Sequence, residues 1–161
     1  AYFNFAKLGV ITDTYKINIY GDAGTSFLHR NGTDRFFVTW LLKSSRVRDR
    51  IAGKSDTEPN EYASAHDMLT LLRCSGSGEP EPTYLDADLT RSETALIEIP
   101  ADIRSVEESD FSKALDWRVE SRRVFSESLS AGFLVTDFRR NGELTGTYLL
   151  ERNRVEDKSI E

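Results

Sequence analysis

The chain has little that would support disulfide or metal chemistry. Its 161 residues include one cysteine, Cys74, and two histidines, His29 and His66. A single thiol excludes an intramolecular disulfide and a cysteine-based metal cluster, and it favours a reducing, cytoplasmic setting. Neither histidine lies in a ligand-spaced motif such as HExxH, so the sequence predicts no metal site.

Long apolar runs and an excess of positive charge are also lacking. No stretch approaches the roughly 20 apolar residues that a membrane-spanning helix needs. The net charge of −6 argues against nucleic acid as the main partner. Arginines are nevertheless clustered within residues 46–50 and 118–123, so a small anionic ligand stays open.

The chain does contain amphipathic segments separated by glycines and turn dipeptides. We expect helices over residues 1–9, 46–52 and 105–131, the last starting again near Asp110, and strands over residues 10–20, 33–42, 93–99, 133–139 and 145–151. Residues 66–74 fit either a strand or a short helix, and residues 74–82 are predicted to be irregular. The pattern predicts an α+β fold in which a mixed, mostly antiparallel sheet is covered by helices.

The two ends of the chain resemble each other. A helix, Gly9, a strand, an Asn-Gly turn and a second strand at the start match the same order around Gly132 at the end. Helix–glycine–hairpin units are common, so both duplication and convergent packing fit. We interpret the chain as one compact domain of a larger protein, with a helix and strands over residues 1–53, a poorly defined connection over 54–93, a strand–helix–hairpin unit over 94–152 and a charged tail over 153–161.

Six stretches together are similar to one known family. They are FNFAKLGV, DRFFVTW and RVRDRIAG in the first third, and IEIPADIRSVEESD, ALDWRVESRRVF and AGFLVTDFRRNGELTGTYLLER further on. As an ordered set they resemble the C-terminal part of a bacterial GNAT-type N-acetyltransferase family, in a little-characterised branch with an extra C-terminal region. The resemblance covers residues 1 to about 152, apart from the middle of the chain.

The resemblance implies acetyl transfer from acetyl-CoA to a small-molecule amine in the intact protein. It identifies residues 1–9 as a late helix of that fold, so the segments that bind the cofactor would lie upstream. We therefore expect no acetyl-CoA bound to this chain itself. Phe5 stands where many family members carry a proton-donating tyrosine, and the isolated chain is expected to be inactive.

One string matches the spacing of the family's cofactor-binding loop. It contains Arg73, Gly76 and Gly78 and is followed by the run EPEP. That run would put carboxylates beside the cofactor phosphates, and its prolines lack the N–H groups that bind them. We interpret the match as accidental.

Two groups of residues are candidates for a substrate pocket. By resemblance, two strands would form a wall of the acceptor site through Tyr15, Asn18, Tyr20, Arg35 and Trp40. Four charged candidates are Glu98, Asp102, Arg118 and Arg122. Arg122 falls on the apolar stripe of its helix, where a buried guanidinium needs a partner. We expect Glu98 or Asp102 to pair with it, and the alternative is an anionic ligand.

A function of another class fits the sequence as well. The chain could be a non-catalytic module that binds a small ligand or forms a homodimer. Tyr2, Phe3 and Phe5 crowd its start and would be exposed without a covering surface. The two classes differ in a simple observable, because only an acetyltransferase would require acetyl-CoA.

Overall fold

The described strands form one mixed sheet. The computed structural model describes residues 1–21, 31–54, 68–84 and 86–152, and within them seven strands lie in the order β2-β1-β6-β7-β5-β3-β4. Neighbouring strands are antiparallel except β3 and β5, which are parallel. The strands are β1 (Ile11–Lys16), β2 (Arg35–Thr39), β3 (Leu69–Cys74), β4 (Pro80–Pro82), β5 (Thr94–Pro100), β6 (Phe133–Asn141) and β7 (Thr145–Arg152). The predicted α+β class is confirmed.

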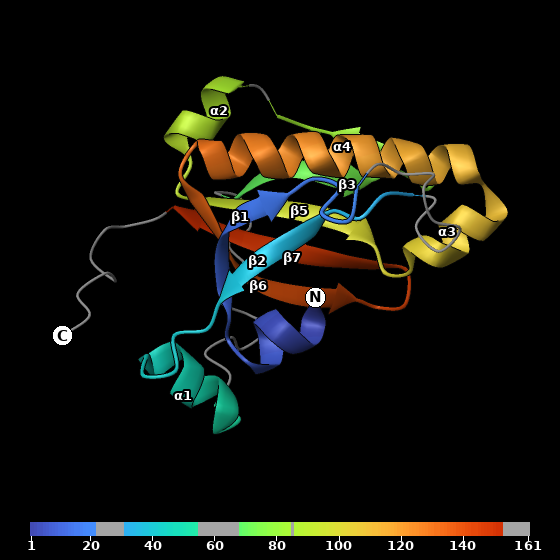
Figure 1. The fold of residues 1–161 in the computed structure, drawn as a ribbon. Helices are drawn as coiled ribbons and strands as arrows, with labels where there is room; N and C mark the ends of the chain where they lie inside the picture. The colour runs from blue at the N-terminus through green and yellow to red at the C-terminus, as the bar shows by residue number, and fades with distance from the viewer. Residues whose placement is uncertain (22–30, 55–67, 85, 153–161) are drawn as a thin grey trace.

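The helices begin where local capping rules place them. They are η1 (Phe3–Lys7, a π-helical segment), α1 (Ser45–Ile51), α2 (Asp86–Arg91), α3 (Ile103–Ser109) and α4 (Phe111–Ser130). The Ser44 side chain accepts a hydrogen bond from the backbone of Val47 at the start of α1. Asp110 ends α3 and accepts from the backbone of Lys113 at the start of α4, so the predicted restart is confirmed. α4 lies across one face of the sheet (Figure 1).

Four segments differ from their predictions or settle a prediction that was left open. The strand expected over residues 10–20 ends at Lys16, because the chain turns at Asn18, whose φ is +49°. Residues 33–42 likewise contain only the shorter β2, and the ambiguous residues 66–74 contain the strand β3. Residues 74–82, which were predicted to be irregular, contain the turn and the strand β4, which pairs antiparallel with β3. β4 holds two prolines and lies at the edge of the sheet, where a missing N–H breaks no hydrogen-bond ladder.

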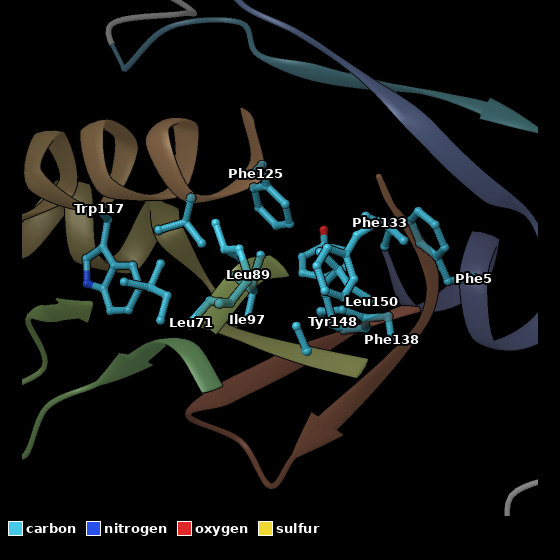
Figure 2. Packing of buried hydrophobic residues seen from close by; sticks show 14 of the residues in the cluster. Phe5, Leu71, Leu89, Ile97, Trp117, Phe125, Phe133, Phe138, Tyr148 and Leu150 are labelled. Atoms are coloured by element: carbon cyan, nitrogen blue, oxygen red, sulfur yellow. The ribbon is translucent and has the colours of Figure 1, made fainter. Parts of the chain in front are cut away.

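Aromatic rings pack between α4 and the sheet (Figure 2). The cluster contains Phe5, Tyr15, Phe36, Phe125, Phe138 and Tyr148, with neighbouring ring centroids between 4.7 and 6.0 Å apart. Phe5 is only 2% exposed and joins η1 to this cluster. Packing of this kind holds a helical segment that is too short to be stable alone.

Candidate ligand-binding site

A cavity of about 450 Å³ lies between α4 and the end of the sheet where β5 and β6 finish and β7 begins. Its wall is mostly aromatic and includes Tyr15, Phe36, Trp117, Phe125, Phe138 and Tyr148. Figure 2 shows Phe125 projecting from α4 toward Tyr148, while Trp117 projects from the same helix beside Leu71 of β3. Small-molecule sites occupy roughly 300–1,000 Å³, so the cavity is large enough for one.

Positive charge gathers on the same cavity. Arg35, Arg118 and Arg140 line it, and Asp34 is the one acidic residue among its described lining. Arg35 and Arg140 are exposed, whereas the Arg118 side chain is mostly buried. The Arg140 guanidinium also lies 4.9 Å from the centroid of the Tyr2 ring. The cavity therefore combines apolar walls with a cationic edge.

Asp34 is the buried acid of the site, with a side chain 1% exposed. Its Oδ2 accepts hydrogen bonds from the Tyr15 hydroxyl and from Arg122 Nε, each at 3.0 Å, and lies 3.5 Å from Nη1 of Arg118. Its Oδ1 accepts from the backbone N–H of Asn18 at 2.9 Å and from Arg122 Nη2 at 3.1 Å. Because every partner donates, the contacts favour the charged carboxylate.

The pKa directions follow from these contacts. Burial alone would raise the pKa of the Asp34 carboxyl, but hydrogen bonds from Arg122, the Asn18 backbone and Tyr15 hold that pKa below its ordinary value. Burial and the adjacent Asp34 charge raise the pKa of the Tyr15 hydroxyl. The hydrogen bond to Asp34 raises the pKa of Arg122. At neutral pH the cluster is a carboxylate, a neutral phenol and guanidinium groups.

The predicted partner of Arg122 is wrong. Its guanidinium pairs with Asp34, which lies 88 residues away in the sequence. Glu98 instead accepts from the Thr145 hydroxyl at 2.7 Å, and Asp102 caps the start of α3. The expectation that Arg122 is held by a carboxylate within the protein is confirmed. The partner was missed because it comes from a segment that no local pattern connects to α4.

The cavity brings together three of the nine predicted pocket residues. They are Tyr15, Arg35 and Arg118. Asn18 and Arg122 contact Asp34 without lining the cavity. Tyr20 is exposed outside the cavity, and Trp40 donates its indole N–H to a backbone carbonyl of the N-terminal segment at 3.0 Å. The acceptor wall predicted from the first two strands is therefore only partly assembled around the cavity.

Several residues that line the cavity were not predicted from the sequence. Asp34, Phe138, Arg140 and Tyr148 belong to segments whose pattern indicates ordinary strands and connections. One signal was present, because Gly146 lies inside a strand, where glycine often marks the close approach of another group. A Cβ at Gly146 would lie 2.3 Å from Cζ of Phe138, so the Phe138 ring occupies the space that a side chain would need.

The glycine-rich string that matched a cofactor loop lies elsewhere. Arg73 is in β3, and Gly76 and Gly78 are in the turn that leads to β4. The Gly78 carbonyl accepts from Trp117 Nε1 at 3.0 Å, which joins this turn to α4. A strand follows the turn, so the string lacks the helix N-terminus that binds phosphate in such loops.

Other kinds of site find no support in the part of the chain that the structure describes. Among those residues, no group of three or more His, Cys, Asp or Glu side chains could hold a metal ion. His29 and His66 lie outside the described residues. No described helix has both the length and the apolar composition to cross a membrane. No family model, curated protein or solved structure matches the chain, so the site is interpreted from its own geometry.

Proposed function

We propose that the chain is a ligand-binding module whose cavity takes a small amphipathic anion. The observation that carries the proposal is the cavity of about 450 Å³ with aromatic walls and a cationic edge. Flat or aliphatic groups of the ligand would pack against the aromatic rings of the cavity wall, because burying apolar surface on these rings stabilises the complex. The anionic group would lie beside the arginines.

The charges favour an anion over an amine. Three arginines line the cavity against one acid, Asp34, and because Arg118 and Arg122 pair with that acid, Arg35 and Arg140 provide the cationic edge. This cationic edge occurs in a chain whose net charge is −6, so overall charge does not explain it. An ammonium ligand would meet repulsion from the arginines and no free carboxylate in the described lining. The charge balance therefore supports the ligand-binding alternative over an amine-acceptor site.

Fluorescence titration with 1-anilinonaphthalene-8-sulfonate tests the proposal. This probe combines aromatic rings with a sulfonate, and we expect saturable binding with enhanced fluorescence. Ser121→Phe places a ring into the cavity from α4 and should weaken binding at least about tenfold. Ser112→Phe adds the same ring at an exposed position of α4 and should leave binding unchanged. Equal binding by the wild type and Ser121→Phe would overturn the proposal.

The cationic edge makes a separate prediction. Arg140→Gln should weaken binding of the same probe about fivefold, because an exposed ion pair is worth up to about 1 kcal/mol. Arg48→Gln removes an exposed arginine from α1, away from the cavity, and should change nothing. Both titrations are repeated at high salt, where the effect of Arg140→Gln should shrink. An Arg140→Gln variant that binds as tightly as the wild type at low salt contradicts the anion preference.

We also propose, from the resemblance, that the chain is the C-terminal part of a GNAT-like N-acetyltransferase that transfers acetyl from acetyl-CoA to an amine. Its support is the pair of helix–glycine–hairpin units, with Gly9 and Gly132 both at positive φ. The first strands of the two hairpins, β1 and β6, pair antiparallel, as two copies related by a local twofold would. A calorimetric titration with acetyl-CoA compares this chain with a form extended upstream. Binding by the extended form alone is expected, and binding by neither contradicts this second proposal.

A further inference from the structure

Tyr148 is one of the buried residues with a polar side chain that line the cavity. It lies on β7 and is 7% exposed, and its side chain lines the cavity wall. Rings of Phe36, Phe125 and Phe138 surround it at centroid distances of 5.5, 5.2 and 4.7 Å. Figure 2 shows its hydroxyl oxygen pointing from the sheet toward α4, beside Phe125. The phenol is therefore held in one orientation by apolar neighbours.

The hydroxyl of Tyr148 has no hydrogen-bond partner among the described residues. The other two tyrosines whose pKa is raised do have partners: the hydroxyl of Tyr15 donates to Asp34, and that of Tyr84 to Glu127. The hydroxyl is not among the fully buried polar atoms that lack a partner, so it is accessible from the cavity that Tyr148 lines and is free to bond a ligand there. Burial raises the pKa of Tyr148 and keeps it a neutral phenol, able to donate and to accept.

We propose that Tyr148 recognises a hydroxyl group at the buried end of the ligand, which we infer to be an aromatic acid that carries a hydroxyl on its ring. This inference rests on the proposed function and names the ligand class for the same cavity. The carboxylate lies at the arginine-lined edge, the ring packs against the cavity-facing sides of Phe36, Phe125 and Phe138, and the ring hydroxyl reaches Tyr148. The end of the ligand that reaches Tyr148 is uncharged, because the surrounding apolar walls could not compensate a charge.

Size and shape fit this class. The aromatic wall favours a flat ring, since offset and edge-on ring contacts add to the apolar contact itself. Charge at one end and a single hydrogen bond at the other would fix the direction in which the ligand lies. Because a site built to bond a hydroxyl leaves a polar group unpaired with the analogue that lacks it, Tyr148 would determine specificity.

Calorimetric titration with two matched acids tests the inference. The probes are 3-(4-hydroxyphenyl)propionate and 3-phenylpropionate, which differ by one hydroxyl. The wild type should bind the hydroxylated acid about fivefold more tightly, as one net hydrogen bond allows. Tyr148→Phe should bind both acids equally. Its thermal stability should equal or exceed that of the wild type, because the substitution removes a group without a protein partner.

Tyr84→Phe is the matched control. Its hydroxyl bonds to Glu127 outside the cavity, so this variant should keep the preference for the hydroxylated acid. Equal binding of the two acids by the wild type overturns the role of Tyr148 and leaves the proposed function standing. A preference that survives in Tyr148→Phe overturns it as well. Failure of both acids to bind the wild type overturns this inference together with the proposed anion site.

Discussion

At the scale of single residues, Asp34 joins parts of the chain that are far apart. It precedes β2, yet its carboxylate accepts hydrogen bonds from Tyr15 on β1 and Arg122 on α4. The same carboxylate binds the backbone at Asn18, where β1 has ended. One buried acid thus positions both the hairpin and the helix that form the cavity.

Removing the charge of Asp34 should destabilise the fold. Asp34→Asn leaves Arg118 and Arg122 without their carboxylate, and we expect a loss of about 2 kcal/mol in the free energy of unfolding, the size of hydrogen bonds to charged groups. Urea denaturation at neutral pH measures it. Asp116→Asn, at an exposed position of α4, serves as the control and should cost little. An Asp34→Asn variant as stable as the control would show that the cluster does not hold the fold.

The Asp34 cluster also predicts a pH dependence. The pKa of the Asp34 carboxyl in the folded chain lies below its ordinary value near 4. At a pH between the folded and the unfolded pKa, the unfolded chain therefore binds more protons than the folded chain. The stabilising contribution is full above a pH of about 4 and is lost as the pH falls through the folded pKa. Denaturation of wild type and Asp34→Asn from about pH 6 to pH 3 should therefore show their stabilities converging. A gap that stays constant or widens toward low pH contradicts the assignment.

At the scale of elements, β6 and β7 shape the cavity through one close approach. The Phe138 ring on β6 covers Gly146 on β7, where a Cβ would lie 2.3 Å from it. Gly146→Ala should displace that ring and destabilise the chain by about 2 kcal/mol, as overpacking does. It should also weaken binding of anilinonaphthalene sulfonate. Gly76→Ala, which meets no atom within 4 Å, is the control in both measurements.

The boundaries of α1, α3 and α4 lie close to the predicted ones because they depend on neighbouring residues, whereas α2, in the connection over residues 54–93, was not predicted. The Asp110 restart and the turn at Gly9 both involve atoms a few residues apart. The end of β1 did not follow, since the Asn18 backbone turns toward an acid 16 residues later in the chain. The strand β4 was missed because its prolines indicate a loop, and only the position at the sheet edge makes them acceptable.

The candidate site followed from the sequence only in part. Tyr15 and Arg35 were predicted from the resemblance and Arg118 from its charge, and the structure gathers them around one cavity. Phe138 and Tyr148 read as ordinary core positions of two strands, because alternation shows which face a residue takes and not whether space is left beside it. A cavity is a property of packing between distant elements, so no local pattern reveals it.

At the scale of the whole molecule, the homodimer expected from the sequence stays a prediction, and β2 is its natural surface. The described sheet ends at β2, where Phe37 and Val38 are exposed. Edge strands with apolar side chains favour pairing with another strand. Light scattering at increasing concentration should show a dimer that Val38→Lys weakens and Leu144→Lys, at the β6–β7 turn, does not. A monomer at every concentration contradicts the prediction.

A crystal structure of the chain soaked with anilinonaphthalene sulfonate tests directly whether the cavity is the binding site. This measurement separates the cavity from the exposed apolar surface of β2, which could also attract the probe. We expect the aromatic rings of the probe to lie in the cavity against Phe36, Phe125 and Phe138, with the sulfonate beside Arg140. Electron density for the probe on β2, with an empty cavity, would contradict the proposal that the cavity is the binding site.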